Sequence, residues 1–140
     1  RHLRLYGFDT HYEPGISDKE IIDHSQQDKR IILTRDRGLL KNRHVTRGYW
    51  IRSAYPPEQI KELFTRFRLK TYVNPFTRCM ECNTILRDAG KEEISVRLLP
   101  NTRLYYHKFK ECPGCGRIYW NGSHYERMEK NIEEMLKDID

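Results

Sequence analysis

The chain of 140 residues lacks any apolar run near the ~20 residues that a membrane-spanning helix needs. It also lacks the basic, apolar and cleavage regions of a secretory signal peptide at its start. Mean hydropathy is −0.87 and 33% of the residues are charged, so most of the surface is ionic. These absences predict a cytoplasmic protein with no membrane segment.

Cysteine is scarce as well. The chain has four cysteines, and all of them fall in two CxxC pairs. The first pair is Cys79 and Cys82, and the second is Cys112 and Cys115. Zn²⁺ prefers four soft ligands in a tetrahedron, and one CxxC turn supplies two of them. A disulfide would need an oxidising compartment, and a CxxC redox pair would be expected beside a βαβ pattern. We therefore predict a structural Cys₄ zinc site, closed to water and substrate.

The cysteine pairs lie within a predicted zinc ribbon over residues 76–125. Its expected strands, chosen for their β-branched and aromatic residues, are 95–99 and 117–120. An acidic amphipathic helix follows over 125–139, and we expect it to pack on its own domain. The sequence thus predicts an α/β domain in residues 1–75, the ribbon in 76–125 and a C-terminal helix in 126–140.

The first half of the chain has the element order of a parallel α/β sheet. The expected elements are a helix closed by Gly7, a strand over 8–12, a helix opened by a Ser17–Glu20 capping box, strands over 30–34 and 49–52, and a helix over 58–67. Because the first residues resemble the last turn of a helix, we expect the sequence to begin partway through a domain.

Positive charge is concentrated in this first half. Residues 1–75 carry 15 Lys and Arg against 9 Asp and Glu, whereas residues 76–140 carry 11 of each. A basic stripe of this kind suits the phosphate backbone of a nucleic acid, although a solvated basic face with no partner is the alternative. The candidate RNA-binding residues in the stripe are Arg35, Arg37, Lys41, Arg43 and Arg47.

Two carboxylates are candidates for a metal site. Asp36 follows the strand predicted over 30–34, and Asp18 opens the helix before that strand, so the two could meet at one edge of the sheet. Carboxylates that converge on Mg²⁺ or Mn²⁺ are typical of metal-assisted phosphodiester hydrolysis. The alternatives are local, because Asp18 also suits a helix N-terminus and Asp36 a turn or N-cap.

Four segments, residues 1–10, 31–40, 76–79 and 116–128, together resemble the RNase-like domain named for the C-terminus of the mut-seven exonucleases, a PIN-like family. The resemblance implies a PIN-like α/β domain fused to a zinc ribbon, and a ribonuclease that uses divalent metal. By position, Asp36 matches the acid after the third strand and Asp18 the acid that opens the preceding helix. The family begins with a strand that carries a further aspartate, which would precede Arg1, and we expect little activity without it.

The segment after the ribbon strands offers two further candidates, His124 as acid, base or phosphate ligand and Arg127 as a phosphate clamp. The alternative is that Tyr119, Trp120 and Tyr125 serve packing and Ser123 caps the last helix. The leading function is a metal-dependent endoribonuclease that acts on RNA, single-stranded rather than duplex. The alternatives are a non-catalytic zinc-ribbon module that binds RNA within a larger assembly, and a protein-binding zinc adaptor.

Overall fold

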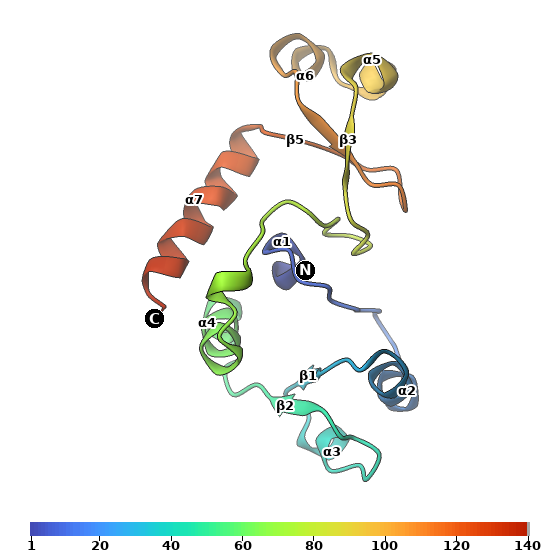
Figure 1. Cartoon of the computed structure of the whole chain (residues 1–140), viewed down its shortest axis with the longest axis vertical. Coiled ribbons are helices and arrows are strands. Elements are labelled where there is room, and N and C mark those ends of the chain that lie inside the picture. The colour runs from blue at the N-terminus through green and yellow to red at the C-terminus, as the bar shows by residue number, and fades with distance from the viewer. Residues whose placement is uncertain (140) are drawn as a thin grey trace. The chain divides into compact units, whose positions relative to one another are not determined.

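The computed structural model describes residues 1–139 and divides the chain into two compact units (Figure 1). The α/β unit is Tyr12–Arg68, and the ribbon unit joins Arg1–His11 to the chain from Leu69 onward. The first eleven residues therefore group with the ribbon and not with residues 12–68. The predicted domain boundaries after residues 75 and 125 stay predictions.

The α/β unit contains a small parallel sheet, as the sequence predicted. Its strands pair in the register Ile32 with Gly48 and Thr34 with Trp50. The elements in chain order are α2 (Asp18–Asp28), β1 (Ile32–Thr34), α3 (Arg37–Leu40), β2 (Gly48–Trp50) and α4 (Pro56–Phe67). Mixed α/β architecture is thus confirmed for this unit, with a sheet of two strands among the described residues.

Local sequence explains where α2 begins and which side it buries. The backbone N–H of Glu20 donates to Ser17 Oγ at 3.2 Å, and the Ser17 hydroxyl lies 3.2 Å from the Glu20 carboxylate, so the predicted N-terminal cap is confirmed. Ile22 on the inner side of α2 packs with Ile32 and Leu39 in one apolar cluster. This cluster fixes α2 and α3 against the sheet.

Two predictions about the strands of the first half are wrong. Residues 8–12 form no strand, because the backbone of Thr10 bonds to the Arg4 and Asn83 side chains in place of a neighbouring strand. The apolar run over 30–34 is not buried throughout, since Ile31 is 48% exposed whereas Ile32 is 6% exposed. A sheet of two short strands buries only part of such a run.

The α4 helix packs through the apolar face that its spacing predicted, with Ile60, Leu63 and Phe64 buried. Glu62 on the same helix joins it to the end of β2. The Glu62 carboxylate accepts hydrogen bonds from the Tyr49 hydroxyl at 2.6 Å and from the backbone N–H of Arg52 at 3.1 Å. Burial opposes the charged form of Glu62, but these hydrogen bonds and that of Ser53 lower its pKa.

The ribbon unit contains an antiparallel sheet of order β3-β4-β5. Figure 1 shows α5 and α6 together at one end of this sheet, and β5 leads into α7. The elements are α1 (His2–Leu5), η1 (Lys70–Tyr72), β3 (Arg87–Ala89), α5 (Lys91–Ile94), η2 (Ser95–Arg97), α6 (Pro100–Tyr105), β4 (Phe109–Glu111), β5 (Ile118–Trp120) and α7 (Ser123–Lys137).

The strand predicted over 117–120 is confirmed as β5, but the strand predicted over 95–99 is wrong. That segment is a 3₁₀ turn, η2, followed by an extended connection. Ile94 and Leu98 are both buried and stand four residues apart, which is the spacing of a helical turn and not of a strand. Val96 is 85% exposed, so the β-branched residue that favoured a strand lies in solvent.

The C-terminal helix is confirmed as α7, which begins two residues earlier than predicted. Its N-cap is Gly122, so Ser123 is the first helical residue and does not cap the helix. Across residues 1–139, no helix combines the length and the apolar character that crossing a bilayer requires.

Glu62→Gln tests the link between α4 and β2. We expect the variant to lower the free energy of unfolding by about 1–3 kcal/mol, because a charged acceptor of several hydrogen bonds is removed. Since the folded pKa of Glu62 is lowered, its contribution is present above the unfolded pKa and is lost as pH falls through the folded value.

Urea unfolding at fixed zinc concentration measures this difference, at neutral pH and again below the ordinary pKa of glutamate. Glu58→Gln is the control, because Glu58 is exposed and its ion pair with Lys61 is 4.0 Å long. Equal stability of the two variants at neutral pH would contradict the assigned role of Glu62.

Candidate functional site

The structure brings the four cysteine sulfurs together, within 4.8 Å of one another. Cys79 Sγ lies 3.6 Å from Cys115 Sγ, and Cys82 Sγ lies 3.3 Å from Cys112 Sγ. Sulfurs about 2.3 Å from a zinc ion at the corners of a tetrahedron would lie about 3.8 Å apart. The donor set and its spacing therefore fit a zinc ion.

The electrostatics of the cluster also favour a cation. Hydrogen bonding with Thr84 lowers the pKa of Cys82 to about 6. The backbone N–H of Arg117 favours the Cys115 thiolate, but burial and the three other sulfurs raise the pKa of Cys115 to about 12. Four thiolates at this distance repel one another, so a divalent cation would replace the protons that otherwise remain.

Tyr119 of β5 supports the first cysteine pair. Its hydroxyl lies 3.1 Å from Cys79 Sγ and accepts the backbone N–H of Met80 at 3.3 Å. The turn from Cys79 to Cys82 forms the first knuckle of the site, and the turn from Cys112 to Cys115 forms the second. Although burial opposes the Cys79 thiolate, the Tyr119 hydrogen bond and the backbone N–H groups of Cys82 and Glu81 lower the pKa of Cys79. Tyr119 thus orients a ligand sulfur and favours its thiolate form.

Arg4 of α1 holds the same knuckle from its carbonyl side. Its guanidinium donates to the carbonyl oxygens of Met80 at 3.0 Å and Glu81 at 2.9 Å, and its Nε donates to that of Thr10 at 2.9 Å. Arg4 is 4% exposed, so these hydrogen bonds satisfy a buried charge. Sequence reasoning missed Arg4 and the role of Tyr119, because nothing in their local sequence marks a partner so far along the chain.

Gly7 lets α1 approach the chain that leads into the first knuckle. Its φ angle is +94°, and a Cβ at this position would stand 2.2 Å from the carbonyl oxygen of Asn74. The backbone N–H of Asn74 donates to the carbonyl of Tyr6 at 2.9 Å, and that of Phe76 to Leu5 at 3.2 Å. The predicted helix end at Gly7 is confirmed, and it positions the N-terminal segment beside the zinc site.

The candidate acids lie in the α/β unit. Asp36 is the N-cap of α3, and its Oδ1 accepts the backbone N–H groups of Gly38 at 2.8 Å and Leu39 at 3.3 Å. Asp18 is exposed in the first turn of α2. Within residues 1–139, neither acid belongs to a group of three or more ligand-type side chains within 4.8 Å.

The five candidate cations of the basic stripe, Arg35, Arg37, Lys41, Arg43 and Arg47, are all exposed. Arg37 lies over the Trp50 ring at 3.8 Å from its centroid, and Arg52 lies 5.5 Å from the same centroid. The stripe therefore includes an aromatic ring that two guanidinium groups approach.

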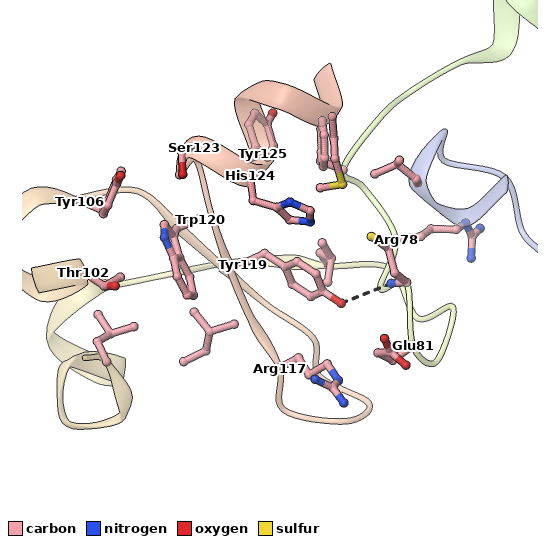
Figure 2. A pocket seen from close by; sticks show the side chains of 18 of the residues that line it. Arg78, Glu81, Thr102, Tyr106, Arg117, Tyr119, Trp120, Ser123, His124 and Tyr125 are labelled. Atoms are coloured by element: carbon pink, nitrogen blue, oxygen red, sulfur yellow. Dashed lines mark hydrogen bonds between the residues drawn. The ribbon is translucent and has the colours of Figure 1, made fainter. Parts of the chain in front are cut away.

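His124 and Arg127 lie in the first turns of α7 and are exposed. His124 lines a groove of the ribbon unit with Tyr119, Trp120 and Tyr125 (Figure 2). Tyr125 packs on Phe76 with ring centroids 3.8 Å apart, so packing accounts for that aromatic. The roles predicted for His124 and Arg127 stay predictions.

The zinc site yields a direct prediction. Purified chain should contain one zinc ion, and Cys112→Ser should lose most of it, because three thiolates leave an open and weaker site. Elemental analysis measures the metal, and Pro113→Ser in the same knuckle should keep it. Zinc-free wild-type protein, or a mass that reveals two disulfides, would contradict the prediction.

Comparisons with known proteins identify one family. Residues 1–132 match the family model described as the Mut7-C RNAse domain, which indicates a nuclease role with RNA as the substrate. A comparison with curated proteins and a comparison with solved structures both find no match. The matched segment contains the two candidate acids and all four cysteines, and covers most of the chain. The chain belongs to the Mut7-C RNAse domain family.

Proposed function

We propose that this chain is a metal-dependent endoribonuclease that hydrolyses RNA phosphodiester bonds, with Asp36 and Asp18 as ligands of Mg²⁺ or Mn²⁺. The observation that carries the proposal is the family match, which spans both acids. The α/β unit supports it, because Asp36 follows β1 at the carboxyl end of a parallel strand, where ligands gather in such sheets.

The environment of Asp36 suits a metal ligand that is also held in place. Both backbone hydrogen bonds end on Oδ1, which fixes the side chain, and Oδ2 has no partner among the described residues. Asp36 is exposed, so an ion and a phosphate have access to it. Asp18 is exposed at the start of α2 and offers a second carboxylate.

Two carboxylates are a sufficient protein contribution for Mg²⁺, which usually keeps several waters and takes further oxygens from substrate phosphates. A bound metal would supply charge stabilisation for the phosphate and an orienting centre for water. The residues of the basic stripe would bind the neighbouring phosphates of the RNA and offset their charge.

One observation favours a second candidate, a non-catalytic module that binds RNA within a larger assembly. Asp36 already serves as the N-cap of α3, and in the described part of the chain neither Asp36 nor Asp18 belongs to a group of three or more ligand-type side chains within 4.8 Å. On this alternative the acids are structural and only the basic stripe contacts RNA.

Cleavage of single-stranded RNA separates the two candidates. With Mn²⁺ or Mg²⁺, protein expressed from the start codon of its own gene should cut single-stranded RNA, and EDTA should stop the reaction. Asp36→Asn should abolish cleavage yet keep the fold, because asparagine is an equally good N-cap. RNA binding should be unchanged or tighter, since a negative charge near the phosphates is removed. Asp18→Asn should also slow cleavage, by less.

Asp23→Asn is the matched control, because Asp23 is an exposed carboxylate in the middle of α2. Gel analysis of end-labelled RNA gives the rates, and circular dichroism confirms the fold of each variant. If Asp36→Asn cuts RNA as fast as wild type, the acids are structural and the binding module is the better account.

The basic stripe predicts a salt dependence. RNA affinity should fall with a log–log slope of roughly −0.7 per bound phosphate on single strands, and Arg35→Ala/Lys41→Ala should reduce that slope by roughly 0.7 for each phosphate that the variant no longer binds. Lys19→Ala/Lys108→Ala removes the same charge at exposed positions outside the stripe. Equal slopes for the two double variants would contradict a role of the stripe in RNA binding.

A further inference from the structure

The ribbon unit contains a groove of about 780 Å³ that no step of the proposed hydrolysis uses (Figure 2). Strand β5, the first turn of α7 and the first cysteine knuckle contribute to its walls. Its charged lining is strongly basic, with four arginines against one carboxylate, Glu81. A groove of this charge favours an anionic ligand.

Most of these arginines are already engaged within the unit. Arg1 pairs with Glu81 at 2.5 Å, and Arg97 pairs with Glu111 at 2.5 Å and also donates to the Gly116 carbonyl. Arg78 donates to the carbonyl of Asn83 at 3.0 Å. The Arg117 guanidinium, in contrast, is exposed and has no partner among residues 1–139. It is the cation of the groove that is available to a ligand.

The aromatic residues of the lining also differ in how far they are engaged within the unit. Tyr125 packs on Phe76, and the Tyr119 hydroxyl bonds at the zinc site. Trp120 also has a ring neighbour, because its centroid lies 6.4 Å from that of Phe109, and one edge of its indole is held against Gly122, but it is 37% exposed and lines the groove. A Cβ at position 122 would stand 3.0 Å from Trp120 Nε1, so a larger residue there would require the indole to shift by a few tenths of an ångström. Trp120 is thus a positioned aromatic surface with an exposed part.

We propose that this groove binds a single-stranded segment of RNA, with a base stacked on Trp120 and a phosphate on Arg117. The inference rests on the proposed ribonuclease function and names a substrate-binding surface for it. Stacking aromatics beside cations are the usual equipment for binding single strands, and they tolerate any base because every base has a π-face. A duplex hides its base faces, so the groove would select unpaired RNA. His124 and the positive end of the α7 dipole lie on the same groove and add attraction for phosphate.

A purely structural role for these two residues makes a different prediction. Arg117 follows Cys115 closely, and its backbone N–H stabilises that thiolate, so its side chain would on this view only balance the charge of the zinc site. Arg117→Ala would then lose zinc, and Trp120→Ala would unfold the ribbon. On our proposal both variants keep one zinc ion per chain and lose RNA affinity.

The test measures RNA binding by the full chain without added Mg²⁺ or Mn²⁺, so that cleavage does not interfere. The probe is a short fluorescent oligouridine, read by anisotropy, and the same strand annealed to oligoadenosine is the duplex arm. We expect Trp120→Ala to weaken single-strand binding about tenfold and Trp120→Phe to restore most of it. Arg117→Ala should reduce the salt slope by roughly 0.7. Tyr105→Ala and Lys108→Ala are matched controls, exposed in the same unit but outside the groove lining.

In a Trp50→Phe background, Trp120 becomes the sole reporter, and unlabelled oligouridine should quench its fluorescence whereas the duplex should not. Fluorescence of the Trp50→Phe protein that does not respond to unlabelled oligouridine would overturn the proposal, and so would Trp120→Ala that binds the single strand as tightly as wild type. If Trp120→Ala also cuts RNA at the wild-type rate in an EDTA-sensitive reaction, the groove fails but the ribonuclease proposal stands. If the groove binds RNA but the protein never cuts RNA, the groove proposal stands and the ribonuclease proposal fails.

Discussion

Convergence of four sulfurs is the constraint on which the ribbon unit depends. Cys79 and Cys112 are among the largest fully buried side chains, and the apolar cluster beside the β3-β4-β5 sheet is small, with Ile94, Leu98 and Phe109 at its centre. Strands of three residues cannot hold a sheet by themselves. A metal ion between the two knuckles would supply the missing cross-link, because its binding energy is also folding energy for the segment.

The N-terminal segment belongs to this arrangement. Arg4 bonds two knuckle carbonyls, and Asn83, directly after Cys82, donates its side-chain amide to Asp9 at 2.7 Å. A disturbance of the zinc site would therefore reach α1, and a disturbance of α1 would reach the knuckle. The groove that we assign to RNA uses the same framework, since Tyr119 and Trp120 are consecutive residues of β5 and their side chains serve the zinc site and the groove respectively.

The sequence predicted what depends on short-range chemistry. CxxC spacing predicted that the four cysteines meet, the Ser17–Glu20 pair predicted the start of α2, and apolar spacing predicted α4 and α7. It did not predict Arg4, whose partners lie 76 and 77 residues away, nor the turn at 95–97, where burial at four-residue spacing prevailed over β propensity. For Asp36 the local sequence does not distinguish two roles, because an aspartate directly after a strand and before a helix suits both an N-cap and a metal ligand.

The central claim of this account is a closed site of four thiolates that holds one zinc ion and organises the ribbon unit. X-ray absorption at the zinc edge of the purified chain tests it most directly. We predict a shell of four sulfur atoms at about 2.3 Å with no nitrogen or oxygen ligand. A shell with fewer sulfurs, completed by nitrogen or by water oxygen, would contradict the claim, because the site would then be open and one cysteine would not be a ligand.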